Sequence, residues 1–97
     1  MKKFKIFWSE NAKQSLKNIY LYYKPKSLQG AKKVRNDILK KVKEIVFAKQ
    51  YQIDEINSKY RRIVVRNYKI LYLVKENRIE IIDIISSKRS PLYLKSL

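Results

Sequence analysis

YRRIVVRNYKILYLVKENRIEIIDIIS, residues 60–86, predicts a three-stranded antiparallel meander. β-Branched and aromatic side chains fill this stretch and favour strands, while two short polar corners at 66–67 and 76–77 favour hairpin turns. Asn67 tolerates a positive φ, which suits the first corner. The last part is apolar on both faces, which is typical of a strand with a neighbour on each side. The expected strands are 60–66, 68–75 and 78–86.

The residues before this meander predict a strand and two helices. Apolar and polar side chains alternate over 3–8, as on a short strand. Ser9 then occupies an N-cap position, and the apolar side chains after it recur at helical spacing until Pro25 ends the helix. Ser27 opens a second helix. The apolar stripe of that helix comprises Leu28, Ala31, Val34, Ile38, Val42, Ile45 and Val46.

The element order is therefore β-α-α-β-β-β, which indicates one α+β domain over residues 1–97. We expect the helix hairpin to pack on one face of a small, mainly antiparallel sheet. The other face is expected to form an open, basic surface that carries tyrosines. The predicted core consists of Leu16, Ile19, Val34, Ile38, Val42, Val65, Ile70, Tyr72, Ile82 and Ile84.

The composition narrows the possible chemistry. The chain of 97 residues has 24 Lys and Arg against 8 Asp and Glu, which gives a formal net charge of +16. Cys and His are both absent, so thiolate and imidazole catalysis and Cys/His zinc sites are excluded. We expect no metal and no cofactor. A charge this high predicts a polyanionic partner, which is nucleic acid, the ribosome, an acidic protein or an anionic membrane.

Nothing in the sequence predicts a membrane segment. No apolar run approaches the roughly 20 residues that a spanning helix needs. The first residues, MKKFKIFW, are basic, but their apolar part is too short and too polar for a signal peptide. The expectation is a cytoplasmic protein without a membrane partner.

Three stretches of the chain together form a recognisable pattern. The first follows W-S-x-x-A-x-x-x-L-x-x-I-x-x-Y, the second is YRRIVVRNYKILYLV, and the third is the Ile-rich IEIIDIISSKRSP. This combination resembles the RelE/ParE superfamily of type II toxin–antitoxin toxins. The resemblance implies a small basic toxin that is neutralised by a co-expressed acidic antitoxin.

The resemblance also implies one of two targets. RelE-like members cleave mRNA on the ribosome, whereas ParE-like members share the fold and act on DNA gyrase. In the RelE-like pattern, the strand after the helices carries two lysines two residues apart; here Arg61 stands at the first position and Ile63 at the second. A tyrosine is expected six residues after the final Lys-Arg pair, but Tyr93 follows Arg89 at four. These departures favour a ParE-like toxin.

The resemblance nominates a small set of basic residues. Lys69, Arg89 and Tyr93 are the catalytic candidates if the chain is RelE-like. The candidates for binding a target or nucleic acid are Arg61, Lys69, Lys88 and Arg89. Three functions stay open at this point. They are a gyrase-binding toxin, a ribosome-dependent mRNA endonuclease, and a small basic nucleic-acid-binding module.

Two further expectations concern side-chain directions. Arg61 and Arg62 are adjacent in a strand and must point to opposite faces, and Arg61 shares its face with the apolar Ile63 and Val65. That parity favours the buried face for Arg61, but the sequence leaves open which face each arginine occupies. Asp83 lies within the Ile-rich strand and, if buried, needs a partner. The cations considered for Asp83 are Lys69, Arg62 and Arg89.

Overall fold

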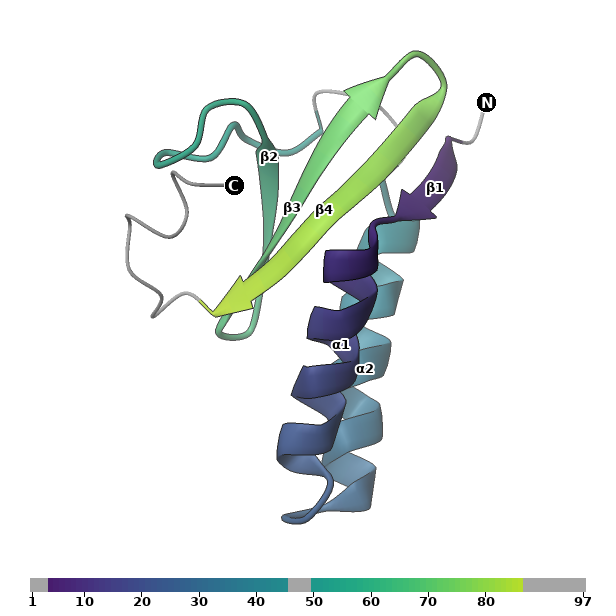
Figure 1. Cartoon of the computed structure of the whole chain (residues 1–97), viewed down its shortest axis with the longest axis vertical. Coiled ribbons are helices and arrows are strands. Elements are labelled where there is room, and N and C mark those ends of the chain that lie inside the picture. Colours follow the sequence, from purple (N-terminus) through teal and green to yellow (C-terminus); the bar gives the residue numbers. More distant parts are fainter. Residues whose placement is uncertain (1–3, 46–49, 87–97) are drawn as a thin grey trace.

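The computed structural model describes residues 4–45 and 50–86 of the chain. Two antiparallel helices lie against one face of a four-stranded sheet (Figure 1). The elements are β1 (Lys5–Trp8), α1 (Glu10–Tyr23), α2 (Leu28–Lys43), β2 (Arg61–Val65), β3 (Tyr68–Lys75) and β4 (Arg78–Ser86). The predicted α+β class and element order are confirmed.

The sheet has the strand order β1-β4-β3-β2. The pairs β2–β3 and β3–β4 are antiparallel hairpins, whereas β1 runs parallel to β4. Parallel strands need a long crossover between them, and the helix hairpin supplies part of that connection. β4 lies between β1 and β3, in agreement with its apolar character on both faces.

Both helices begin as the sequence predicts. The Ser9 hydroxyl accepts the amide of Ala12, and the Ser27 hydroxyl accepts the amide of Gly30. The apolar stripe of the second helix is shorter than expected, because α2 ends at Lys43 and Leu28 is 47% exposed at its start. Val46 of that stripe lies outside the described residues. No helix in the described part of the chain is both long and apolar enough to cross a membrane.

The residues with positive φ in the two hairpin turns differ from the expectation for Asn67. Positive φ occurs at Arg66, with φ 55°, and at Glu76, with φ 54°, rather than at Asn67. In each two-residue turn the first central residue therefore takes the unusual conformation, as in a type II′ turn. The expectation for Asn67 was wrong because turn type, and not residue tolerance alone, decides which position has positive φ.

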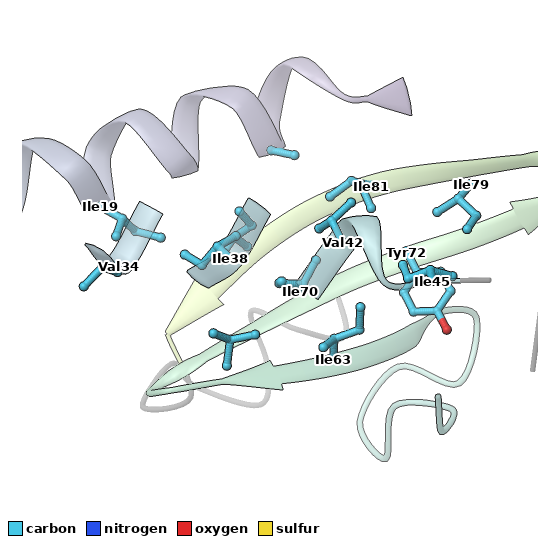
Figure 2. Close-up of a cluster of buried hydrophobic side chains, with 13 residues drawn as sticks. Ile19, Val34, Ile38, Val42, Ile45, Ile63, Ile70, Tyr72, Ile79 and Ile81 are labelled. Atoms are coloured by element: carbon cyan, nitrogen blue, oxygen red, sulfur yellow. The ribbon is translucent and has the colours of Figure 1, made fainter. Parts of the chain in front are cut away.

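The main core lies between the helices and the sheet, as Figure 2 shows. Eight of the ten predicted core residues are buried there, while Leu16 is only partly buried at its edge. Ile82 packs instead with a second cluster on the opposite sheet face. The buried members from the prediction are Ile19, Val34, Ile38, Val42, Val65, Ile70, Tyr72 and Ile84.

The opposite sheet face differs from the expected open basic surface. Tyr60, Leu71 and Ile85 form a buried apolar cluster there. The segment 50–60 wraps around the free edge of β2, with the Gln52 carbonyl accepting the amide of Arg62. The Arg62 amide on this edge strand is thereby satisfied, and the segment covers part of the face.

Candidate functional site

A buried carboxylate organises the basic residues on the second sheet face. Asp54 is 2% exposed and lies in the segment that wraps around β2. One carboxylate oxygen lies 3.1 Å from the Lys69 ammonium and 3.8 Å from the Arg62 guanidinium. The other oxygen accepts the amides of Ile56 at 3.1 Å and Asn57 at 2.8 Å. Each oxygen of this buried group therefore has a donor.

The surroundings of Asp54 favour its ionised form. Burial alone would raise the pKa of the carboxyl, because desolvation penalises the charge. The Asn57 amide, the Lys69 ammonium and the Ile56 amide together outweigh burial and lower the pKa of Asp54 below its ordinary value. Lys69 therefore faces a carboxylate that carries a full negative charge at neutral pH.

Arg61 lies on the other side of the sheet. Its guanidinium donates to the Tyr51 carbonyl at 2.8 Å, and its strand position pairs with Tyr72. Tyr72 is fully buried, its hydroxyl has no hydrogen-bond partner among the described residues, and burial raises the pKa of that hydroxyl. The Arg61 side chain thus shares the helix-covered face with Ile63 and holds a loop carbonyl.

The structure consequently separates two of the predicted site residues. Arg61 pairs across the ladder with Tyr72, whereas Lys69 pairs with Val64, and these pairs present their side chains to opposite faces. A single phosphate could not contact both cations from one side of the sheet. Arg61 and Lys69 therefore do not form one cationic cluster. The other three candidates, Lys88, Arg89 and Tyr93, lie outside the described residues.

Among the described residues, a hydroxyl and a backbone amide donate hydrogen bonds to the buried Asp83 carboxylate, whereas the sequence predicted a cation. A register shift next to Leu71 interrupts the β3–β4 ladder at this point. The Asp83 carboxylate accepts the Ser15 hydroxyl of α1 and the amide of Ile84. Two of the expected cationic partners, Lys69 and Arg62, bind Asp54 instead. This contact joins α1 to the part of β4 that extends beyond β1.

Tyrosines connect α1 to the β2–β3 hairpin. The Tyr68 hydroxyl donates to the Tyr23 hydroxyl at 3.4 Å, and the Tyr22 and Tyr23 rings meet edge to face with centroids 5.1 Å apart. Burial and the Tyr23 contact raise the pKa of Tyr68. The phenol therefore stays neutral and acts in packing rather than as a base.

Asp54 is not among the functional residues predicted from the sequence, although it organises the basic residues of this face. The acids were scattered along the chain, and Asp54 stood in a segment with no clear periodicity. A local signal existed, because an Asp that caps the amides two and three residues ahead forms a common turn. The described residues hold no group of three or more His, Cys, Asp or Glu side chains that could bind a metal ion.

The family follows from comparison with known proteins. The model for "ParE toxin of type II toxin-antitoxin system, parDE" matches residues 6–91. The chain belongs to the ParE toxin family. This ParE-family chain is accordingly a toxin of a type II toxin–antitoxin system. Comparison with curated proteins gave no match.

One solved structure supports the fold of this ParE-family chain. A chain described as "Chromosomal ParDE TA system from P. aeruginosa" is similar, with a TM-score of 0.75 and 20% identity over 89% of this chain and 98% of that one. A chain of the "YoeB-YefM complex from Staphylococcus aureus" gives a TM-score of 0.41 at 19% identity, covering 84% of this chain and 94% of that one. The first of these confirms the ParE-like fold.

Proposed function

We propose that this toxin inhibits growth by binding DNA gyrase and does not cleave RNA. The observation that carries the proposal is the separation of Arg61 and Lys69 onto opposite faces of the sheet. Membership of the ParE family points the same way, because the resemblance to ParE-like toxins implies gyrase as the target.

The chemistry of RNA cleavage supports this choice. Without a metal, the reaction needs a base for the 2′-hydroxyl, cations on the phosphate and an acid for the leaving oxygen, all within hydrogen-bond reach. Lys69 is instead held 3.1 Å from the ionised Asp54, so its charge is already compensated. Arg61 is occupied by the Tyr51 carbonyl. Neither cation is free to assemble a phosphate site with the other.

We further propose an acidic antitoxin as the partner that neutralises the toxin. The net charge of +16 would steer an acidic protein to the surface and make association fast and salt-dependent. A screen for partners at low ionic strength should return an acidic protein. Recovery of nucleic acid alone would contradict the antitoxin proposal.

Two assays run in parallel test the mechanism. We expect the purified chain to inhibit supercoiling by gyrase while leaving translation of an mRNA template intact. Inhibited translation with cleaved mRNA and normal supercoiling would establish a RelE-like endonuclease instead. Nucleic-acid binding without effect in either assay would favour the basic binding module.

A further inference from the structure

The charge of the chain is distributed unevenly along the molecule. Residues 11–36, here called the helical arm, contain no Asp or Glu. The arm comprises most of α1, the turn and the first half of α2, and its far end extends beyond the sheet (Figure 1). Its seven cations are Lys13, Lys17, Lys24, Lys26, Lys32, Lys33 and Arg35.

Cations outside the arm are paired far more often. Within the described part of the chain, the ion pairs near the sheet join Arg62 to Asp54 and Glu55, Lys69 to Asp54, Arg66 to Asp37, and Lys75 and Arg78 to Glu80. In the arm the ion pair seen among the described residues joins Lys13 to Glu10, which lies just before it. The arm therefore carries uncompensated positive charge.

Six of the exposed polar residues of the arm form two rows. Lys13 and Lys17 of α1 and its C-cap residue Lys24 fall within about 40° of one another around the helix axis, because an α-helix turns about 100° per residue and Lys24 keeps helical backbone angles. On α2 the corresponding row lies within about 60°. It consists of Gln29, Lys32 and Asn36. All six side chains are exposed.

The two rows belong to one surface. Both rows point away from the buried residues of their own helices, which include Ile19 on α1 and Ile38 on α2. The helices meet between the rows, where the Arg35 guanidinium lies 4.9 Å from the centre of the Tyr20 ring. The outer surface of the hairpin thus presents lysines and amides, with no acidic side chain, along about 20 Å of helix.

We propose that the helical arm binds the phosphodiester backbone of nucleic acid through Lys17, Lys24 and Lys32. Ammonium and amide donors without a competing carboxylate suit phosphate oxygens. A second copy of this chain would be repelled by the same charge. The inference goes beyond the proposed function, because it assigns the toxin a binding activity that needs neither gyrase nor antitoxin.

Other anionic partners fit this surface less well. The exposed apolar side chains Leu21, Tyr22 and Leu28 gather near the turn, so a membrane that met them would leave the lysines farther along the arm unused. An acidic amphipathic helix would need apolar residues along the rows, where the chain has amides and lysines. The phosphodiester backbone of nucleic acid is long and uniformly charged, so it can contact lysines along the whole length of the arm.

The test measures binding of the full chain to labelled 20-base-pair duplexes of DNA and of RNA by fluorescence anisotropy between 50 and 200 mM salt. The arm variant is Lys17→Gln/Lys24→Gln/Lys32→Gln. The control is Lys5→Gln/Lys59→Gln/Lys75→Gln, which removes the same charge from exposed sites outside the arm. Vesicles with anionic lipid and polyglutamate are offered as competing probes. Thermal midpoints verify that both variants fold.

We expect the arm variant to bind at least about tenfold more weakly than the control at 100 mM salt. The slope of log affinity against log salt should fall in magnitude by about 2.7 for three lost phosphate contacts. Tighter binding to one of the two duplexes identifies DNA or RNA as the nucleic acid that the arm prefers. Equal affinity indicates that the arm contacts the phosphodiester backbone common to both. Equal losses in both variants, or binding to vesicles or polyglutamate but not to the duplexes, would overturn the proposal. Gyrase inhibition is assayed separately. A toxin that does not inhibit gyrase would contradict the proposed function without changing the result of the nucleic-acid binding experiment.

Discussion

The Lys69 ammonium lies 3.1 Å from the buried Asp54 carboxylate, and this pair ties the segment 50–60 to the second face of the sheet. The same carboxylate holds the Arg62 guanidinium and two backbone amides. A cation that the family resemblance nominates for function is thereby built into the fold. Any effect of changing Lys69 must be separated from an effect on stability.

Asp54→Asn should destabilise the protein by about 2–3 kcal/mol, because it leaves Lys69 and Arg62 half-buried without their counter-charge. Urea unfolding at pH 7 measures the loss. Glu55→Gln is the matched control, since the Glu55 side chain is 81% exposed and its pair with Arg62 contributes little. Equal midpoints for the Asp54 variant and the wild type would show that this network does not stabilise the fold.

The stabilisation by Asp54 should depend on pH in one direction. The pKa of Asp54 is lower in the folded chain than in the unfolded chain, where it is about 3.9. The contribution is therefore complete above about pH 5 and is lost as the pH falls through the folded-state pKa. The difference in unfolding free energy between wild type and Asp54→Asn should stay constant from pH 8 to 5 and shrink below pH 4. If the difference in unfolding free energy between the two proteins increases as the pH falls below 4, the lowered pKa of Asp54 is contradicted.

Ile38→Ala and Ile82→Ala should differ in cost. Ile38 is fully buried between the helices and the sheet, so its truncation should cost about 3–4 kcal/mol. Ile82 is only partly buried in the smaller cluster, and about 1–2 kcal/mol is expected. Denaturant midpoints with unchanged m-values measure both. A larger loss for Ile82 would mean that the second cluster is the more important core.

Glu76→Gly should stabilise the second hairpin. Glu76 has a φ of 54°, a conformation that penalises any side chain and that glycine adopts freely. The gain is expected to be below about 1 kcal/mol, because glycine also loses more backbone entropy on folding. Thermal unfolding would detect it as a rise in Tm, and Glu76→Ala, which keeps the Cβ, should show no such rise.

Arg89→Ala tests a residue that stands among both the catalytic and the binding candidates. Loss of growth inhibition is expected with a thermal midpoint close to that of the wild type, because Arg can bind a carboxylate or phosphate through two hydrogen bonds. Lys5→Ala removes one exposed charge and serves as the control. Tyr93→Phe should leave gyrase inhibition intact, whereas an RNase that uses this hydroxyl would lose activity. Toxicity that survives in Arg89→Ala would remove Arg89 from the site.

The elements of this protein follow from local sequence. Ser9 and Ser27 cap the helices, Pro25 separates them, and alternation of side chains defines the strands. Strand geometry also required Arg61 and Arg62 to point to opposite sides of the sheet, but which of them faces the helices was decided by the structure. The absence of Cys and His excluded thiolate and imidazole catalysis and Cys/His zinc sites without any structure.

The pairing of distant groups needed the tertiary structure. Whether Lys69 meets Asp54, Asp83 or a phosphate depends on how the segment 50–60 wraps around β2, and that path has no periodic signal in the sequence. Ser15 reaches Asp83 only because the β3–β4 register shifts beside Leu71. Local patterns determine which way a side chain points, but the free energy of a buried charge depends on which donors the folded chain brings within about 3 Å of it.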